Sequence, residues 1–318
     1  MTLAAAPDGV QPLLDEIAAR MADEVERGMP AQYIPELAKA DASRFALAVA
    51  PASGGILAAG DADIAFSIQS VSKVFTLTLA LERAGAGVWQ RVGREPSGTA
   101  FNSIIQLELE RGVPRNPFIN PGAIVIADIL GEGRSVEETG TEILGFLRRL
   151  TEDETIAVDE AVAASEARTG HRNVSLASFM KAEGNLRGDV ADVLAVYFRH
   201  CAIAMTVRQL AAAGRFLAAA GTNGCAQVVA PERARRLCAL MQTCGHYDAS
   251  GEFAYRVGIP AKSGVGGAIL GVVPGVASVV AWCPGLDEKG NSLIGSRALE
   301  ILAARTGWSV FSPRHCAP

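Results

Sequence analysis

The segment FSIQSVSKVF, Phe66–Phe75, joins a strand-like part of the chain to a long helical part. It contains the pattern S-x-x-K at Ser70 and Lys73, which places the two side chains on one face of a helix. Capping explains a serine at a helix start. It does not explain Lys73, a charge inside an apolar run that continues to Leu81. We therefore consider Ser70 as a nucleophile at the positive end of a helix dipole, activated by a deprotonated Lys73.

A second motif, Lys262-Ser263-Gly264, lies just before an apolar strand-like stretch. S-x-x-K followed far downstream by K-[ST]-G is the arrangement of penicillin-binding proteins and class A β-lactamases. A small residue at a sheet edge lets a backbone N–H approach the substrate and form an oxyanion hole with the N–H of the serine. A simple Lys-Ser-Gly turn before a strand is the alternative. The order of strands and helices around both motifs favours the catalytic interpretation.

The spacing of apolar residues predicts the elements of the first two thirds of the chain. A helix is expected over about Val10–Arg27, from apolar residues at helical spacing. The runs FALAVA and GILAAG, joined by Pro51–Gly54, predict a β-hairpin. From residue 70 to about 220 the pattern is helical, and Ser135 with Glu138 forms a capping-box pattern.

Strands are expected again near the C-terminal end. FAYRVG, Phe253–Gly258, predicts a strand, and a closing helix is expected over Ser292–Arg305. Between them, Ser263–Leu286 carries no charge and is long enough for a membrane span. Pro274-Gly275 divides it into GGAILGVV and VASVVAWC, each strand-sized and rich in β-branched residues. A buried β-hairpin is therefore the better interpretation, and no membrane segment is expected.

Together these elements predict an α+β fold. The economical arrangement is an antiparallel sheet of roughly five strands, built from both ends of the chain and flanked by the terminal helices. An all-helical lobe is inserted between its strands. The expected division is one catalytic unit over residues 1–318, with a discontinuous α/β lobe at about 1–69 and 221–318 and a helical lobe at about 70–220.

Composition excludes several classes of protein. The chain has 318 residues, 49% hydrophobic and 20% charged, as in a globular protein. The net charge of −5 and the lack of a dense Lys/Arg stripe argue against a nucleic-acid partner. The start MTLAAAPDGV lacks the features of a secretory signal, so the cytoplasm is expected. Six irregularly spaced cysteines and four histidines without ligand spacing predict free thiols and no metal site.

Further blocks, in one order along almost the whole chain, resemble the serine-dependent glutaminases of the β-lactamase-like superfamily. That family hydrolyses L-glutamine to L-glutamate and ammonia. Several blocks in a fixed order are far more specific than any single motif. The blocks are QYIPELA (Gln32–Ala38), QSVSK (Gln69–Lys73), VGREPSGTAFNS (Val92–Ser103), PRNPFINPGAI (Pro114–Ile124), SEARTGHRN (Ser165–Asn173), YF (Tyr197–Phe198), CGHYDASGEFA (Cys244–Ala254) and PAKSGVGGAI (Pro260–Ile269).

The resemblance implies a role for each matching residue. Ser70 would be the nucleophile and Lys73 its activating partner. Tyr33 and Tyr247 would lie beside the scissile amide, with Tyr247 a candidate for proton transfer, and the backbone N–H groups of Ser70 and Val265 would form the oxyanion hole. The positions that match the family's substrate-binding residues are Ser70, Asn120, Glu166, Asn173, Tyr197, Tyr247 and Val265.

The chemistry of the substrate agrees with these roles. Glutamine carries an ammonium group, for which the carboxylate of Glu166 is suited. Its carboxylate and amide suit neutral donors, which side-chain amides and phenols supply. Each residue also has a purely structural interpretation: an exposed acid at a helix end for Glu166, turn or cap residues for Asn120 and Asn173, and core aromatics for Tyr33 and Tyr197. The block-wise match favours the functional one.

One position departs from the family pattern, in which alanine usually follows the residue matching Asn120. Here Pro121 follows, and proline lacks an N–H and restricts the residue before it. If Asn120 binds substrate through its side chain, the site should tolerate this change.

The resemblance implies L-glutamine as substrate, no cofactor, and a homo-oligomer, either a dimer or a tetramer. Two alternatives remain open at this point. One is another serine acyl-enzyme hydrolase of the same scaffold, a β-lactamase or D-Ala peptidase, although no convincing S-D-N box lies between the two motifs. The other is a sensor that binds an amino acid or a β-lactam without turnover. The sequence does not decide whether Lys73 or Tyr247 takes the first proton.

Overall fold

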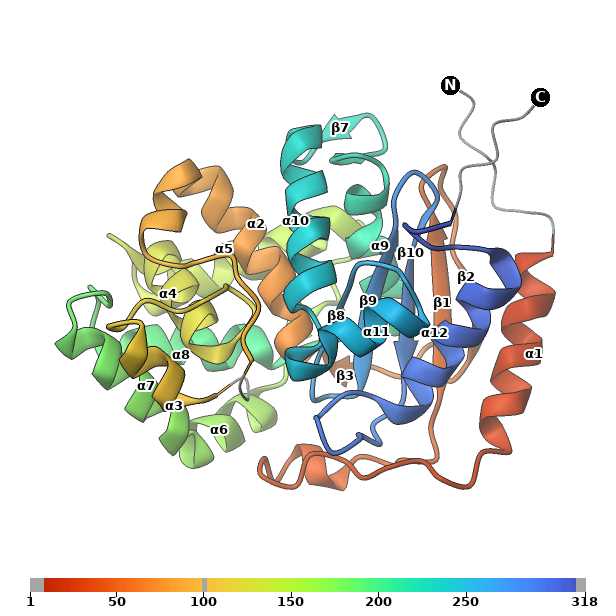
Figure 1. Cartoon of the computed structure of the whole chain (residues 1–318), viewed down its shortest axis with the longest axis horizontal. Coiled ribbons are helices and arrows are strands. Elements are labelled where there is room, and N and C mark those ends of the chain that lie inside the picture. The colour runs from red at the N-terminus through yellow and green to blue at the C-terminus, as the bar shows by residue number, and fades with distance from the viewer. Residues whose placement is uncertain (1–8, 99–101, 313–318) are drawn as a thin grey trace.

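A five-stranded antiparallel sheet forms the centre of one half of the molecule (Figure 1). The computed structural model describes residues 9–98 and 102–312. The strand order is β2-β1-β10-β9-β8, so strands from the two ends of the chain lie side by side. The strands are β1 (Ala46–Pro51), β2 (Leu57–Gly60), β8 (Ala261–Ser263), β9 (Ala268–Val273) and β10 (Ala277–Trp282). The expected sheet and its first hairpin are confirmed.

Helices cover both faces of this sheet, because side chains alternate between the faces along each strand. Leu47 and Val49 of β1 pack with the terminal helices α1 (Val10–Ala22) and α12 (Leu293–Thr306). Alanines of β1 point to the other face, where α9 (Val207–Ala218) packs. α9 approaches closely through a glycine: a Cβ at Gly214 would lie 2.7 Å from a methyl carbon of Leu270. α9 thus lies against the sheet, although its residues fall within the range expected for the helical lobe.

The other helices gather mainly beside the sheet, to its left in Figure 1. The predicted capping box of Ser135 and Glu138 is present at the start of α5. The helices are α2 (Ser72–Ala84), α3 (Ile104–Leu109), α4 (Asn120–Gly131), α5 (Val136–Thr151), α6 (Glu160–Thr169), α7 (His171–Ala182), α8 (Val190–Cys201), α10 (Pro231–Cys244) and α11 (Ser250–Arg256). Short 3₁₀ turns are η1 (Leu37–Lys39), η2 (Gln69–Val71), η3 (Gly85–Gln90) and η4 (Tyr247–Ala249). Short strands are β3 (Phe66–Ser67), β4 (Ala157–Val158), β5 (Ile203–Met205), β6 (Thr222–Asn223) and β7 (Ala226–Gln227).

Two expectations about single elements are wrong. FAYRVG is not a strand: most of it lies in α11, with Phe253 and Val257 buried at helical spacing and Tyr255 exposed. The third C-terminal strand is β8 instead, which contains the lysine and serine of the KSG motif. The first helix ends at Ala22 rather than Arg27, because the Arg27 guanidinium turns back to donate to the carbonyl of Met21.

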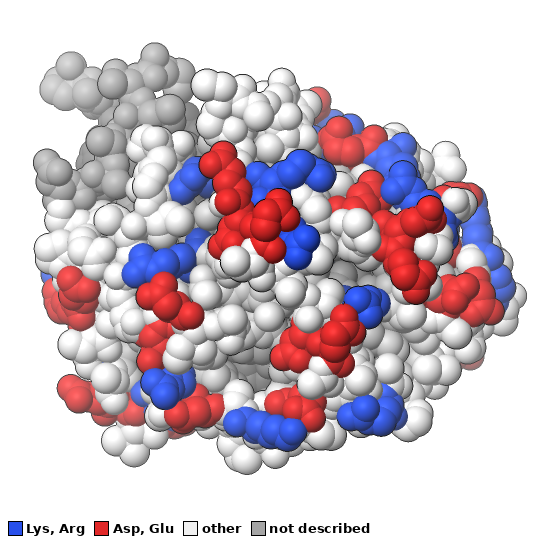
Figure 2. Space-filling model, turned by 180° about the vertical axis from the view of Figure 1, so that it is seen from behind, with Lys and Arg blue, Asp and Glu red and all other residues white. Residues whose placement is uncertain are grey.

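The long uncharged segment forms β9 and β10, joined at Pro274-Gly275, as the hairpin interpretation predicted. Among residues 9–98 and 102–312, no helix has the length and apolar character needed to cross a membrane. Many surface charges form ion pairs, such as Arg305 with Glu16. Figure 2 shows one face on which acidic and basic side chains lie next to each other.

The turn between β8 and β9 packs against the segment that leads into α2, almost two hundred residues earlier in the chain. Gly264 and Gly266 make this possible. A Cβ at Gly264 would lie 2.7 Å from the carbonyl oxygen of Ile68, and one at Gly266 only 2.1 Å from that of Ser67. The Trp282 indole N–H donates to the carbonyl of Gly266 and its ring stacks on Phe66. Only glycine permits this backbone-to-backbone approach.

Gly266→Ala tests this contact. We expect it to destabilise the protein by about 1–3 kcal/mol, because the added methyl group meets backbone that must shift. Gly251→Ala in α11 is the matched control, because no atom lies within 4 Å of its added Cβ. It should be neutral or stabilise by about 0.5–1 kcal/mol. Equal free energies of unfolding for the two variants in urea titrations would contradict the packing described.

Candidate active site

Ser70 lies in η2, buried, where the β8–β9 turn meets the start of α2. A Cβ at Gly264 would be 3.2 Å from the Ser70 nitrogen, so the two backbones are in contact. Val265 follows Gly264 in this turn, and within the described residues no backbone carbonyl accepts its N–H. The residue before the serine, Gln69, has φ +47°, a conformation that is uncommon for a residue other than glycine. Strained backbone of this kind often occurs at functional sites.

Tyr247 is the side chain that the structure brings to Ser70. The two side chains share a hydrogen bond, which opposes the effect of burial that raises the pKa of Tyr247. The Tyr247 hydroxyl also lies 3.4 Å from the carbonyl oxygen of Ser263. Lys262 from the KSG motif is fully buried, with Nζ 4.6 Å from the centre of the Tyr247 ring, and burial lowers the pKa of Lys262 well below its usual value. A phenol therefore adjoins the serine, and a buried lysine lies against the ring of that phenol.

Lys73, on the first turn of α2, is also buried, but its ammonium does not bind Ser70 directly. Nζ donates to Asn120 Oδ1 at 2.7 Å and lies 3.5 Å from the carbonyl oxygen of Phe118. It also lies 5.6 Å from the centre of the Tyr197 ring. Burial lowers the pKa of Lys73 to about 8, so part of the population is a neutral amine at neutral pH. The hydrogen bonds of the Lys73 amine therefore go to Asn120 and Phe118.

Glu166 and two asparagines form the polar end of the site. Glu166 is buried, and its Oε1 accepts from Gln69 Nε2 at 2.7 Å. Burial raises the pKa of Glu166 to about 7, with the Gln69 hydrogen bond opposing this effect. Asn120 Nδ2 donates to Asn173 Oδ1 at 3.0 Å. Asn120 therefore links Lys73 to Asn173. Gln69, which directly precedes Ser70, holds Glu166.

A pocket of about 70 Å³ opens onto this polar end. Its lining includes Tyr33, Asn120, Glu166 and Asn173, four of the residues chosen from the sequence. Tyr33 is 57% exposed, so the core-aromatic interpretation of this residue is wrong. The exposed-acid interpretation of Glu166 is also wrong. The lining does not include Ser70, Lys73, Tyr197, Tyr247 or Val265. Lys73 reaches it through its hydrogen bond to Asn120, and Gln69, the residue before Ser70, through its hydrogen bond to Glu166.

Pro121 fits its position. It is among the first residues of α4, where the first N–H groups have no intrahelical partner, so a missing donor costs little. Asn120 meets Lys73 and Asn173 through its side chain. The departure from the family pattern therefore leaves these contacts in place.

Sequence reasoning assigned no role to Gln69, Lys262 or Arg172. Arg172 lines the pocket, and the other two contact site residues. The signal for Gln69 was available, because it is a polar residue inside an apolar segment directly before the serine. Residues 99–101 of the block Val92–Ser103 lie outside the described residues. His315 and Cys316, near the C-terminus, also lie outside them. Asn102 of that block lines the pocket.

Comparison with known proteins decides the family. The family model described as Glutaminase matches residues 28–311. The chain belongs to the glutaminase family. A glutaminase of Rhodopseudomonas palustris strain BisB18 is 60% identical over 304 residues, covering 95% of this chain and 97% of the relative. A glutaminase of Mesorhizobium japonicum is 60% identical over 302 residues, covering 94% and 96%.

Solved structures of glutaminases share the fold. A probable glutaminase, ybaS, superposes with a TM-score of 0.91 at 37% identity, covering 95% of this chain and 98% of that one. Mglu in its tris and glutamate form gives a TM-score of 0.91 at 36% identity, covering 96% of this chain and 68% of that one. The predicted α+β fold class of the glutaminases is confirmed.

The raised pKa of Glu166 in this glutaminase predicts how stability depends on pH. The folded protein holds this proton up to about pH 7, against a usual value of 4.5, so burial of the carboxylate costs stability as pH rises between these values. Glu166→Gln removes the cost. We expect the variant to gain stability over the wild type between pH 5 and pH 8, by up to about 3 kcal/mol.

Denaturant titrations at pH 5 and pH 8 measure this difference. Glu160→Gln is the control on the same helix, because Glu160 is exposed and pairs with Arg199 at the surface. A Glu166→Gln difference that is the same at both pH values would contradict the assignment of a buried, proton-holding carboxyl.

Proposed function

We propose that the chain hydrolyses L-glutamine to L-glutamate and ammonia through a γ-glutamyl ester on Ser70. The observation that carries the proposal is the hydrogen bond between Ser70 and Tyr247 at the point where the turn containing Val265 meets the start of α2. The relative Mglu, 36% identical, has a structure described as its glutamate form, which supports an amino acid of this kind as ligand.

In this mechanism the Ser70 hydroxyl attacks the carboxamide carbon of glutamine. Its carbonyl oxygen takes up negative charge between the N–H groups of Ser70 and Val265, an arrangement that stabilises the tetrahedral intermediate. Support comes from the Val265 N–H, which no carbonyl of the described residues accepts, and from the contact between the two backbones. Collapse of the intermediate breaks the C–N bond and leaves the ester.

Proton transfer must remove a proton from Ser70 and deliver one to the departing nitrogen. We infer that Tyr247 passes this proton on rather than storing charge, because its pKa is raised and it already bonds Ser70. Lys73 is a candidate to accept the proton: its pKa is lowered to about 8, so a neutral amine is available, which becomes ammonium when it takes the proton up. Water then attacks the ester with the same groups working in reverse, which releases glutamate and restores Ser70. No cofactor is required.

Recognition of glutamine is assigned to the polar end of the site. We infer that Glu166 pairs with the substrate ammonium, and that Asn120, Asn173 and Tyr33 donate to its carboxylate. All four line the same pocket. Tyr197 is buried beside Lys73 and is assigned to shaping the wall of the site. Replacing the hydrogen bonds now made within the protein by bonds to substrate keeps the buried groups of Glu166 and Asn120 satisfied.

We also propose the division into an α/β lobe, at about 1–69 and 221–318, and a helical lobe at about 70–220, with α9 of that range packed on the sheet. A homo-oligomer, dimer or tetramer, in the cytoplasm completes the proposal. Exposed Ile105 and Leu109 on α3 support self-association, since apolar side chains close together on a surface favour protein contacts.

Ser70→Ala tests the covalent step. We expect ammonia release from glutamine to fall by about 10⁴-fold or more, because no ester can form, while glutamate still binds in calorimetry. Ser72→Ala is the control: Ser72 lies two residues on but bonds His200 and the Gln69 carbonyl, away from Tyr247. It should keep turnover within about tenfold. Unchanged turnover in Ser70→Ala discards the mechanism, and hydrolysis of nitrocefin but not glutamine favours the β-lactamase alternative.

Glu166→Gln tests substrate recognition. We expect KM for glutamine at pH 8 to rise about 10- to 100-fold with a smaller change in kcat, as loss of a charge-assisted hydrogen bond requires. In the wild type, KM should rise as pH falls below about 7, where the carboxyl takes up its proton. Steady-state assays of ammonia release at pH 6–8 measure both effects, with Glu160→Gln as control. A KM that neither responds to pH nor changes in the variant removes Glu166 from the binding site.

A further inference from the structure

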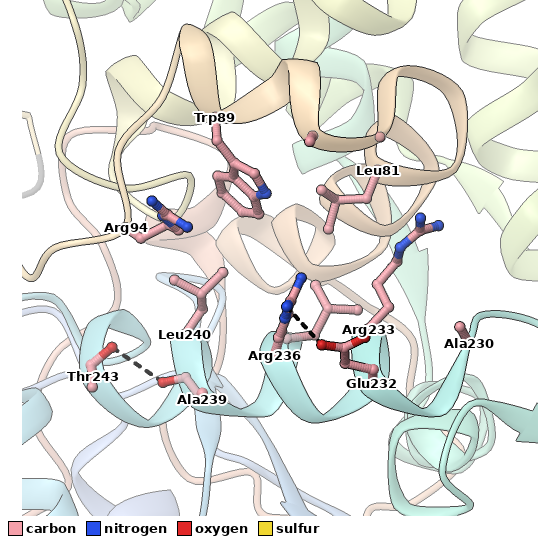
Figure 3. A pocket seen from close by; sticks show the side chains of 13 residues that line it. Leu81, Trp89, Arg94, Ala230, Glu232, Arg233, Arg236, Ala239, Leu240 and Thr243 are labelled. Atoms are coloured by element: carbon pink, nitrogen blue, oxygen red, sulfur yellow. Dashed lines mark hydrogen bonds and ion pairs between the residues drawn. The ribbon is translucent and has the colours of Figure 1, made fainter.

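A second and larger cavity lies away from the candidate active site. It is a groove of about 630 Å³ between α10 and the end of α2 with η3 (Figure 3). None of its lining residues lines the 70 Å³ pocket beside Glu166. Its volume is within the range of about 300–1,000 Å³ that is usual for small-molecule sites. The glutamine hydrolysis proposed above makes no use of it.

The groove has apolar walls on opposite sides. Leu81 at the end of α2 and Trp89 of η3 point into it from one side. Leu240 points toward them from α10, and Leu237 of the same helix also lines the groove. A partly buried indole opposite leucine side chains offers a flat apolar surface, on which an aromatic or aliphatic body can lie.

The charge of the groove is positive, in contrast to the net charge of −5 of the whole chain. Its lining holds three arginines, Arg94, Arg233 and Arg236, against one acid, Glu232. Arg236 pairs with Glu232, and Arg233 with Glu82 outside the lining. Arg94 forms no ion pair with a described carboxylate; its guanidinium lies 5.6 Å from the centre of the Trp89 ring. A guanidinium beside an indole is suited to a carboxylate attached to an apolar group.

Both walls of the groove continue into the candidate active site. α2 and η2, on one side, carry Lys73 and Ser70. α10, on the other, ends at Cys244, and the following Gly245 carbonyl accepts from Lys262 Nζ just before Tyr247. A molecule that bridges these walls therefore fixes the spacing of two helices, of which α2 follows the nucleophile and α10 precedes its hydrogen-bond partner.

The Arg94 segment adds a third connection. The next residue, Glu95, accepts a hydrogen bond at its carbonyl from the side chain of Asn116. The Asn116 Oδ1 in turn accepts from the N–H groups of Phe118 and Ile119, which directly precede Asn120. Two successive hydrogen bonds, both made by Asn116, thus connect the neighbour of Arg94 with the neighbour of Asn120, the asparagine that bonds Lys73.

We propose that this groove is an effector site for an organic anion with one carboxylate and an apolar, aromatic-sized body. The carboxylate binds Arg94 at the Trp89 end, and the body lies between Leu81 and Leu240. Binding there and binding of glutamate in the active site strengthen each other, because both favour the same placement of α2 against α10. The coupling rests on the proposed function, whereas the binding itself does not.

Calorimetry with indole-3-acetate as the probe tests the site. We expect Kd on the order of 0.1–1 mM, as is reasonable for a ligand of this size. Indole lacks the carboxylate and acetate lacks the apolar body, so each should bind at least about tenfold more weakly. Addition of saturating indole-3-acetate should tighten glutamate binding about fivefold, and glutamate should tighten indole-3-acetate binding by the same factor.

Two variants locate the binding. Arg94→Gln removes the carboxylate partner, and Ala239→Trp fills the groove from an exposed position on α10. Each should weaken indole-3-acetate at least about tenfold while glutamate binding in the absence of the probe stays as in the wild type. Arg235→Gln is the matched control, because Arg235 is exposed on α10 but does not line the groove.

Three results would overturn the proposal. The first is no binding of indole-3-acetate to a wild type that still binds glutamate. The second is binding that both groove variants leave unchanged, which places the probe elsewhere. The third is a wild-type oligomer that Ala239→Trp dissociates, in sedimentation runs, because the groove then holds a second copy of the chain. A wild type that does not turn over glutamine would instead count against the proposed function, and the result on indole-3-acetate binding would still hold.

Discussion

The contact between the β8–β9 turn and the segment before α2 is the constraint on which the site depends. It joins backbone to backbone, with Gly264 and Gly266 against the carbonyls of Ile68 and Ser67. Because no side chain intervenes, the two segments pack backbone against backbone, and a larger residue at either glycine would push them apart. The approach of Gly264 to the Ser70 nitrogen, one residue before Val265, depends on this contact. The sheet, in turn, holds the β8–β9 turn through β9 and its pairing with β10.

The second physical feature of the site is the burial of ionisable side chains. Lys73, Glu166 and Lys262 all lie in the interior, and in each case loss of hydration is the largest cause of the altered pKa. The direction differs with the charge: the acid holds its proton more tightly and the amines more weakly, so each neutral form is favoured. The same desolvation that costs stability brings the acid and one amine close to neutral pH. This is the range in which proton transfer is most useful.

The sequence predicts the sheet and the motif pairing well, because both depend on local patterns. The alternation in β1, the turn at Pro274-Gly275, and the S-x-x-K and KSG motifs are visible without coordinates. FAYRVG was misassigned because a short apolar run does not distinguish a strand from a turn of helix. The packing of α9 on the sheet depends on Gly214 approaching Leu270, a contact between distant segments that no local pattern encodes.

The partners of the site residues were harder to predict than the residues themselves. S-x-x-K spacing places Lys73 near Ser70, but the Lys73 ammonium donates its hydrogen bond to Asn120 Oδ1 instead. Gln69 becomes important through its positive φ and its bond to Glu166, neither of which follows from its identity alone. The groove is a further case, because Trp89 and Leu240 come from separate helices and meet only after folding.

The strand order has a consequence for synthesis of the protein on the ribosome. β1 pairs with β2 on one side and with β10 on the other, and more than two hundred residues are translated between β1 and β10. Until β10 emerges, one edge of β1 has no partner and its apolar faces are only partly covered, a condition that favours aggregation. The nascent chain therefore passes through a long interval in which Ser70 is already made, but the β8–β9 turn and Tyr247, which lie beside it in the folded protein, have not yet been translated.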